Sequence, residues 1–228
     1  MAGGQSGESA MGKTADADVN YMLAWVAVRG LSPGKALEAI DREISDVADA
    51  RESPGWPDFL NRQDYHDRIF MGRLPGNWLL LFGSLDEEDK ELLVELTELG
   101  PAFAGDISRI GSFAEARSYA RGEEVWRVNY DLESNDSNNL LQVDGQLPSA
   151  LAAIVDRARA TEAEGREAGI DVLFEVPGQL SKAICGFSPH EEPPEGFRWS
   201  MLQRIGGEVG PEPKRQPKGC LALLFGWR

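Results

Sequence analysis

The strongest chemical signature in the chain lies near its start, where Gly7–Thr14 is written GESAMGKT. These letters fit the phosphate-binding pattern G-x-x-x-x-G-K-[ST], in which backbone amides hold the phosphates while the lysine and threonine reach the outer phosphates and magnesium. That chemistry requires a buried strand before the first glycine and a helix near the lysine. The flanking residues MAGGQS and ADADVN predict neither element. We therefore interpret residues 1–17 as a disordered leader that binds no nucleotide.

The histidines and cysteines predict no catalytic or metal-binding set. His66 lies in a connector, and His190 precedes EEPPEG, which lacks the second histidine of a zinc-binding helix. Cys185 lies in the apolar segment KAICGF, where a thiol packs as a small hydrophobic side chain. Carboxylates are abundant, but none of their spacings matches a calcium-binding loop. The sequence therefore predicts no cofactor and no metal, and it favours a protein that is not an enzyme.

Charge and hydropathy narrow the class of partner. The 228 residues include 23 Lys and Arg against 38 Asp and Glu, a formal net charge of −15. Such a balance argues against nucleic-acid binding, which needs a basic face. The apolar runs at 78–82 and 220–225 are far shorter than the roughly 20 residues of a membrane helix, and the first residues lack the pattern of a secretory signal. We expect a cytoplasmic protein with a basic protein partner, and with no nucleic-acid or membrane partner.

Hydrophobic periodicity predicts an α+β domain over residues 18–188, with a mostly antiparallel sheet of about six to eight strands and three or four packed helices. Residues 189–228 form a Pro- and Gly-rich extension whose two apolar segments, FRWSMLQRI and CLALLFGW, suit late strands. The helices are expected over 33–45, from Ser84 to a left-handed cap at Gly100, from 147 onwards and from Pro177. The earlier strands are expected over 20–28, 68–74, 77–82, 101–108, 113–120, 124–131 and 140–145.

Two local signals are sharper than the rest. Pro75-Gly76 separates RIFMGRL from NWLLLF and predicts a tight hairpin, with the second strand inside the sheet. In EVWRVNYD, Trp126, Val128 and Tyr130 alternate with Arg127 and Asn129, so one side of that strand is apolar and the other polar.

Aromatic and acidic residues outside these patterns are the candidates for a binding surface. Trp25, Trp78 and Trp126 fall inside predicted strands and are expected in the core, whereas other tryptophans lie in connectors and can serve as exposed anchors or pin the loops to the body. The acidic loop after EVWRVNYD is interpreted as a solvated turn. The candidate partner-binding residues are Trp56, Asp131, Glu133, Asp136 and Trp199.

Three stretches together carry a family resemblance: AWVAVRGLSPGKALEAI, then SYARGEEVWRVNYD, then DGQLPSALAAI followed by IDVLFEVPGQLSKAICGF. Their order resembles uncharacterised bacterial proteins of the toxin-immunity type, over about residues 20–187. The shared motifs are structural, so the resemblance implies no catalytic residues. It implies a cytoplasmic protein that binds and neutralises a toxin.

Three functions follow as hypotheses. The first is an acidic stoichiometric binding module, most concretely a bacterial immunity protein against a basic toxin. The second is a hydrolase or nucleotide-processing enzyme, which a cleft with a desolvated carboxylate beside Tyr65, His66 or Arg68 would favour. The third is a structural or regulatory subunit of a larger bacterial assembly, which would dock through the apolar stripe at 221–227.

Overall fold

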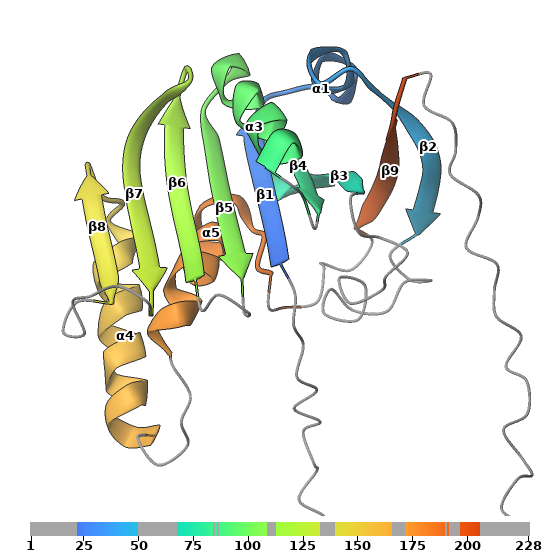
Figure 1. The fold of residues 1–228 in the computed structure, drawn as a ribbon. Helices are drawn as coiled ribbons and strands as arrows, with labels where there is room; N and C mark the ends of the chain where they lie inside the picture. The colour runs from blue at the N-terminus through green and yellow to red at the C-terminus, as the bar shows by residue number, and fades with distance from the viewer. Residues whose placement is uncertain are drawn as a thin grey trace, which may run out of the picture.

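The sequence folds around one nine-stranded sheet in which every neighbouring pair of strands is antiparallel (Figure 1). This computed structural model describes residues 22–49, 68–83, 85, 87–108, 113–132, 140–165, 172–189, 191 and 197–205. The sheet order is β2-β9-β3-β4-β1-β5-β6-β7-β8. The strands are β1 (Met22–Arg29), β2 (Arg42–Asp49), β3 (Ile69–Leu74), β4 (Trp78–Gly83), β5 (Ala102–Ser108), β6 (Phe113–Ala120), β7 (Glu123–Asp131), β8 (Leu141–Gly145) and β9 (Arg198–Arg204).

Four α-helices accompany the sheet in the part of the chain that the structure describes: α1 (Pro33–Ala39), α3 (Glu87–Glu95), α4 (Ala150–Gly165) and α5 (Val176–Cys185). The predicted α+β class is therefore confirmed, with nine strands where six to eight were expected. None of the helices in these residues is long and apolar enough to span a membrane.

The helices lie on both faces of the sheet. In Figure 1, α4 and α5 lie behind β5–β8, whereas α3 lies in front of β1 and β4. Successive residues of a strand point to opposite faces, so Leu23, Trp25 and Ala27 of β1 join the core under α4 and α5. Val26 and Val28 join a second core under α1 and α3. The central strands β1 and β4 are therefore apolar on both sides, as the run WLLLF predicted.

The hairpin and the helix starts follow the sequence signals. Pro75–Asn77 forms a tight turn between β3 and β4, with Gly76 at a φ of 72°, and the predicted hairpin is confirmed. Ser32 caps α1 by accepting a hydrogen bond from the backbone N–H of Lys35 at 3.4 Å.

Two predicted helix ends are wrong. The helix expected over 33–45 ends at Ala39, because Asp41 adopts a left-handed φ of 49° and turns the chain into β2. Ile44, expected on a buried helix face, is a strand residue that is 45% exposed. Gly100 has an extended φ of 170° rather than a left-handed one, because α3 tightens into a 3₁₀ turn that passes directly into β5.

The segment FRWSMLQRI provides β9, which lies between β2 and β3. Residues 198–204 of the predicted extension are therefore part of the same sheet as residues 22–145. The predicted leader at 1–17, the apolar segment 220–227 and Ser84, where the second helix was expected to begin, lie outside the described residues.

Candidate functional site

The face of β5–β8 that lies opposite α4 and α5 carries polar side chains in two rows across the strands; we call it the open face. The pairing register sets Asp106 beside Glu115, Asn129 and Gln142 in one row. In the next row, Arg117 lies beside Arg127 and Asp144. Adjacent side chains on a sheet face interact directly, so each row is a line of charges and amides fixed by the backbone.

The open face and α3 enclose a cleft of about 300 Å³. Its floor is formed by β1 and β5, whose small residues there, among them Ala24 and Ala104, leave space for the cleft. One wall is α3, with Leu93 and the half-exposed Val94, and the other is β6. The residues that line the cleft are Ala24, Trp25, Val26, Lys90, Glu91, Leu93, Val94, Ala104, Gly105, Asp106, Glu115, Arg117 and Tyr119.

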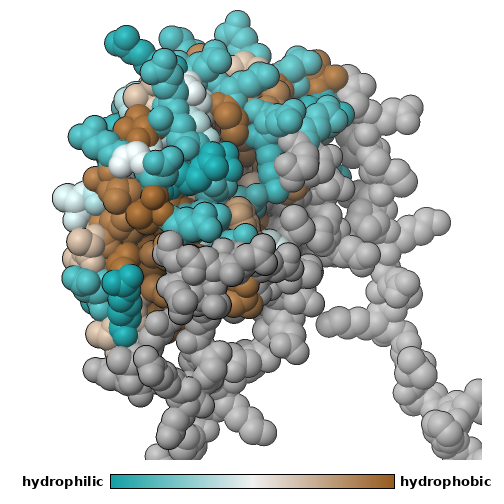
Figure 2. All heavy atoms as spheres, turned by 60° about the vertical axis from the view of Figure 1, so that its left-hand side comes forward, coloured by the Kyte–Doolittle hydropathy of each residue, from teal (hydrophilic) through white to brown (hydrophobic). Residues whose placement is uncertain are grey.

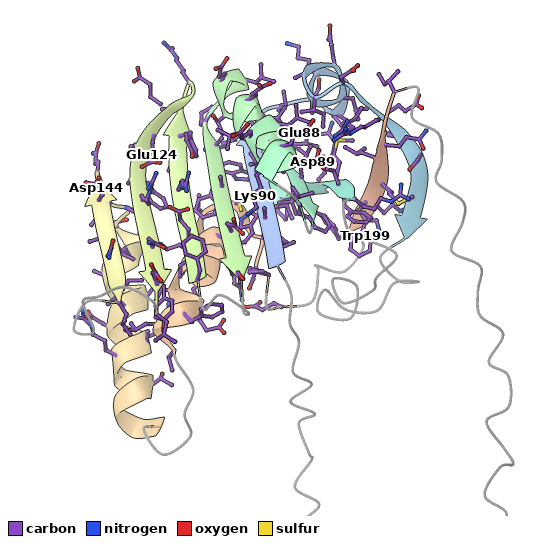
Figure 3. The ribbon with its side chains drawn as sticks, in the orientation of Figure 1. Glu88, Asp89, Lys90, Glu124, Asp144 and Trp199 are labelled. Carbon is purple, nitrogen blue, oxygen red and sulfur yellow. The ribbon has the colours of Figure 1, made fainter. Side chains whose placement is uncertain are left out.

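Ion pairs hold the charged groups of this cleft in place. Lys90 extends from α3 over β5 (Figure 3), where its Nζ lies 2.7 Å from Asp106 Oδ2. Glu115, whose side chain is only 6% exposed, pairs with Arg117 beside it. Its second oxygen lies 3.2 Å from Arg127 Nε, and Arg127 also donates to Glu124 at 2.8 Å. The carboxylates of Asp106 and Glu115, which are neighbours in one row, are thus paired with three cationic side chains: Lys90, Arg117 and Arg127.

The two arginines remain charged in this setting. Burial lowers the pKa of Arg117, but the hydrogen bonds and charges of Glu115 and Tyr119 outweigh it, so its pKa lies above the usual value. The pKa of Arg127 is also raised, chiefly by its hydrogen bond to Glu124. The cleft therefore presents guanidinium groups in fixed positions beside the carboxylate of Glu115.

Exposed carboxylates border the cleft along α3 and the turn that follows it. Glu91, Glu95 and Glu98 recur at helical spacing on the solvent side, and we call them the acidic stripe. In the part of the chain that the structure describes, no ion pair involves these three carboxylates. On the open face, the buried Oδ1 of Asn129 accepts no hydrogen bond from a described residue. The acidic stripe therefore offers exposed acceptors to a donor from outside, whereas the oxygen of Asn129 is buried.

A buried ion pair joins α3 to β2, the strand at the end of the sheet opposite β8. Asp89 Oδ1 lies 2.6 Å from Arg42 Nη2 of β2, and the two side chains are 7% and 10% exposed. Figure 3 shows Glu88 and Asp89 on the side of α3 that faces β2 and β9, whereas Lys90 is on the opposite side. The helix is thus tied to β2 on one side and to β5 on the other, which sets the width of the cleft.

The two candidate residues that the structure describes, Asp131 and Trp199, do not lie on one surface. Asp131 lies at the end of β7 on the open face, half-buried, with its backbone N–H donating to the carbonyl of Leu140. Trp199 is 1% exposed in β9, where its ring packs against Phe70, Phe82 and Phe197, so it belongs to the core and is not an exposed anchor. At about 4.8 Å per strand, β9 and β7 are about 29 Å apart.

Other sequence candidates fall outside the described residues: Trp56, Glu133, Asp136, Tyr65, His66 and His190. Arg68 is described but does not line the cleft. The residues that do line it were not singled out from the sequence. The segment FAEARSYA did indicate a polar strand face, because Glu115 and Arg117 occupy alternate positions of a strand. Arg127 and Asn129 do the same in the next strand.

Cys185 lies apart from this site and serves packing, as its apolar segment predicted. It is buried, its Sγ donates to the carbonyl of Ser181 at 3.2 Å, and burial raises the pKa of the thiol. In a Cys220→Ser background, we expect the native chain to react with a thiol reagent at least about 100-fold more slowly than the urea-unfolded chain, because the thiolate is the reactive form. Complete labelling of the native chain at the unfolded rate would contradict this burial.

Comparison with protein-family models, with curated proteins and with solved structures finds no match to this chain.

Proposed function

We propose that this protein is a stoichiometric binding module for a basic protein, most concretely a bacterial immunity protein that neutralises a basic toxin in the cytoplasm. The observation that carries the proposal is the cleft of about 300 Å³ bordered by the acidic stripe. The formal net charge of −15 adds a long-range attraction for a cationic partner. A concave site beside carboxylates that form no ion pair with a described residue suits a basic side chain that enters from a protein surface.

The arrangement favours a protein over a small cation. Glu115 and Asp106 inside the cleft are already paired with Arg117 and Lys90, so the attraction for a cationic partner comes from the acidic stripe, of which Glu91 also lines the cleft. The apolar wall of Leu93 and Val94 offers contact to the stem of a long side chain. A partner that contacts the stripe and places one arginine or lysine over the cleft satisfies both features.

Neutralising the acidic stripe is expected to slow association. We expect Glu91→Gln/Glu95→Gln/Glu98→Gln to reduce the association rate constant about tenfold at about 0.01 M salt, where the Debye length is about 30 Å, and much less at about 0.15 M. The matched control Glu38→Gln/Asp41→Asn/Asp156→Asn removes three exposed carboxylates elsewhere and should change the rate less than about twofold. Stopped-flow mixing with the purified partner measures both. Equal effects of the two variants would reject the stripe as the docking surface.

The cleft has its own test. Ala104→Leu fills the floor of the cleft without changing any charge, so it should raise the dissociation rate and leave the association rate almost unchanged. The partner is identified by affinity capture with the intact chain and then purified. A basic partner bound one-to-one, whose toxicity to growing cells is relieved by co-expression of this chain, supports the proposal. A partner with an acidic surface, or salt-independent association, would overturn it.

A further inference from the structure

The strand β8 ends the sheet on the side of α4, and along its outer edge no described residue pairs with the backbone groups of Leu141 and Val143. The backbone N–H of Asp131 donates to the carbonyl of Leu140, and that of Gln146 donates to the carbonyl of Val125, both across the β7–β8 pair. Because donors and acceptors alternate along an antiparallel strand, the even-numbered residues of β8 face β7. The backbone groups of Leu141 and Val143 therefore point away from β7, towards the open edge.

The opposite end of the sheet is protected in a way that β8 is not. β2 carries charged residues at Arg42, Glu43, Asp46 and Asp49, and a bulge interrupts its pairing with β9 between Ile44 and Asp46. Charges and bulges are the usual means by which an edge strand avoids pairing with another chain. The pairing of β8 with β7 has no such register shift, and Asp144 is its only charged residue.

Apolar side chains follow the same edge. Val143 is 48% exposed, Leu132 52% and Leu147 40%. Figure 2 turns this side of the molecule forward and shows an apolar area there with hydrophilic side chains around it. By strand alternation, Val143 points to the face of the sheet that α4 covers, whereas Gln142 and Asp144 point to the open face.

We propose that β8 is a self-complementary edge, at which two copies of this chain pair antiparallel about a two-fold axis through Val143. In this register Val143 lies opposite Val143 of the second copy, and the two exchange backbone hydrogen bonds. Gln142 lies opposite Asp144, so the single carboxylate of the strand faces a neutral residue, and no two like charges lie directly opposite one another. The valines and leucines of the edge are then buried against their counterparts, and the two sheets become one.

The charge of the chain sets the salt dependence of this pairing. Each copy carries a net charge of −15, so the copies repel at low salt and the repulsion is screened as salt rises. Self-association is therefore expected to strengthen from about 0.01 M to about 0.5 M salt. Association with a basic partner has the opposite dependence, which separates this inference from the proposed function.

Sedimentation equilibrium of the full chain tests the proposal. We expect a concentration-dependent dimer at about 0.5 M salt, and slower amide hydrogen exchange at Leu141 and Val143 as the dimer forms. Val143→Pro removes only an outward-facing N–H, so it should leave the sheet intact by circular dichroism and give a monomer. Val143→Lys keeps the N–H but places a charge on the edge, and it should also give a monomer.

Two controls keep the test specific. Val143→Thr retains a β-branched side chain and the N–H, and should still dimerise. Leu99→Thr removes an equally exposed apolar side chain, at 48%, far from β8 and should not affect dimerisation. A chain that stays monomeric at about 0.5 mM and high salt, or a dimer that survives in both Val143→Pro and Val143→Lys, would overturn the proposal.

Discussion

Replacing Trp25 by alanine is expected to lower the free energy of unfolding by about 4 kcal/mol, which is typical of a large buried aromatic residue. The side chain is 1% exposed, its ring centroid lies 5.4 Å from that of Phe187, and its Nε1 donates to Ser181 Oγ at 3.1 Å. The substitution leaves a cavity at the centre of the sheet and removes a buried hydrogen bond. Urea unfolding followed by far-UV circular dichroism measures the loss.

A second substitution makes this prediction specific to the packing seen here. Gly105 of β5 lies under the indole, and a Cβ on it would come within 2.1 Å of Trp25 Cζ2. Gly105→Ala should therefore cost about 3 kcal/mol in the native background but little once Trp25 is alanine. If the two losses simply add, the indole does not lie against Gly105.

Replacing Asp89 by alanine is the second large effect, with an expected loss of about 3–5 kcal/mol. Asp89 and Arg42 are both almost fully buried and lie 2.6 Å apart, so the variant leaves a buried guanidinium without its carboxylate. Arg204 Nη2, 3.8 Å from the same oxygen, also loses this contact but keeps Glu88 Oε1 at 3.6 Å. Chemical unfolding should show a lower midpoint with a similar slope, since the fold itself is retained.

A double variant separates the effect of the ion pair between Arg42 and Asp89 from the effect of the volume that the two side chains fill. Arg42→Met/Asp89→Leu replaces both charges by apolar side chains of similar volume, and this variant should recover stability to within about 1 kcal/mol of the native chain. Asp89→Asn keeps the shape and one acceptor, so its loss should be smaller than that of alanine. An Asp89→Ala variant as stable as the native chain would show that Arg42 reaches solvent when its partner is removed.

Much of the sheet was predictable because its local signals agree with its tertiary structure. The alternation in EVWRVNYD, the turn at Pro75-Gly76 and the start of α5 at Pro177 all lead to elements that the structure contains. The prediction of a helix over 33–45 was wrong at its end, because the same spacing of apolar residues fits either a helix or a strand. Leu37, Ile40 and Ile44 suit a helix stripe, yet β2 pairs with β9, a strand more than 150 residues later, and that pairing decides the outcome.

The candidate site was harder to predict, because its residues come from elements whose neighbours the sequence does not reveal. Glu115, Arg117 and Arg127 lie on strands that were expected, but their meeting depends on the register of β6 and β7. Lys90 belongs to the helix expected from Ser84 to Gly100, but the sequence does not reveal that this helix lies over β5. Trp199 was misjudged because its Pro-rich surroundings indicate a connector, whereas β9 is a buried inner strand.

The position of β9 has a consequence for how the chain is made. Among the described strands, β2 has no neighbour other than β9, so a nascent chain that has reached residue 49 holds a strand without its partner until residue 198 has left the ribosome. At about 5–20 residues per second, this interval lasts about 7–30 s. During translation β2 is therefore the segment most open to a chaperone or to misassembly, and a transcript truncated before β9 would release a product whose sheet is left unfinished at that end.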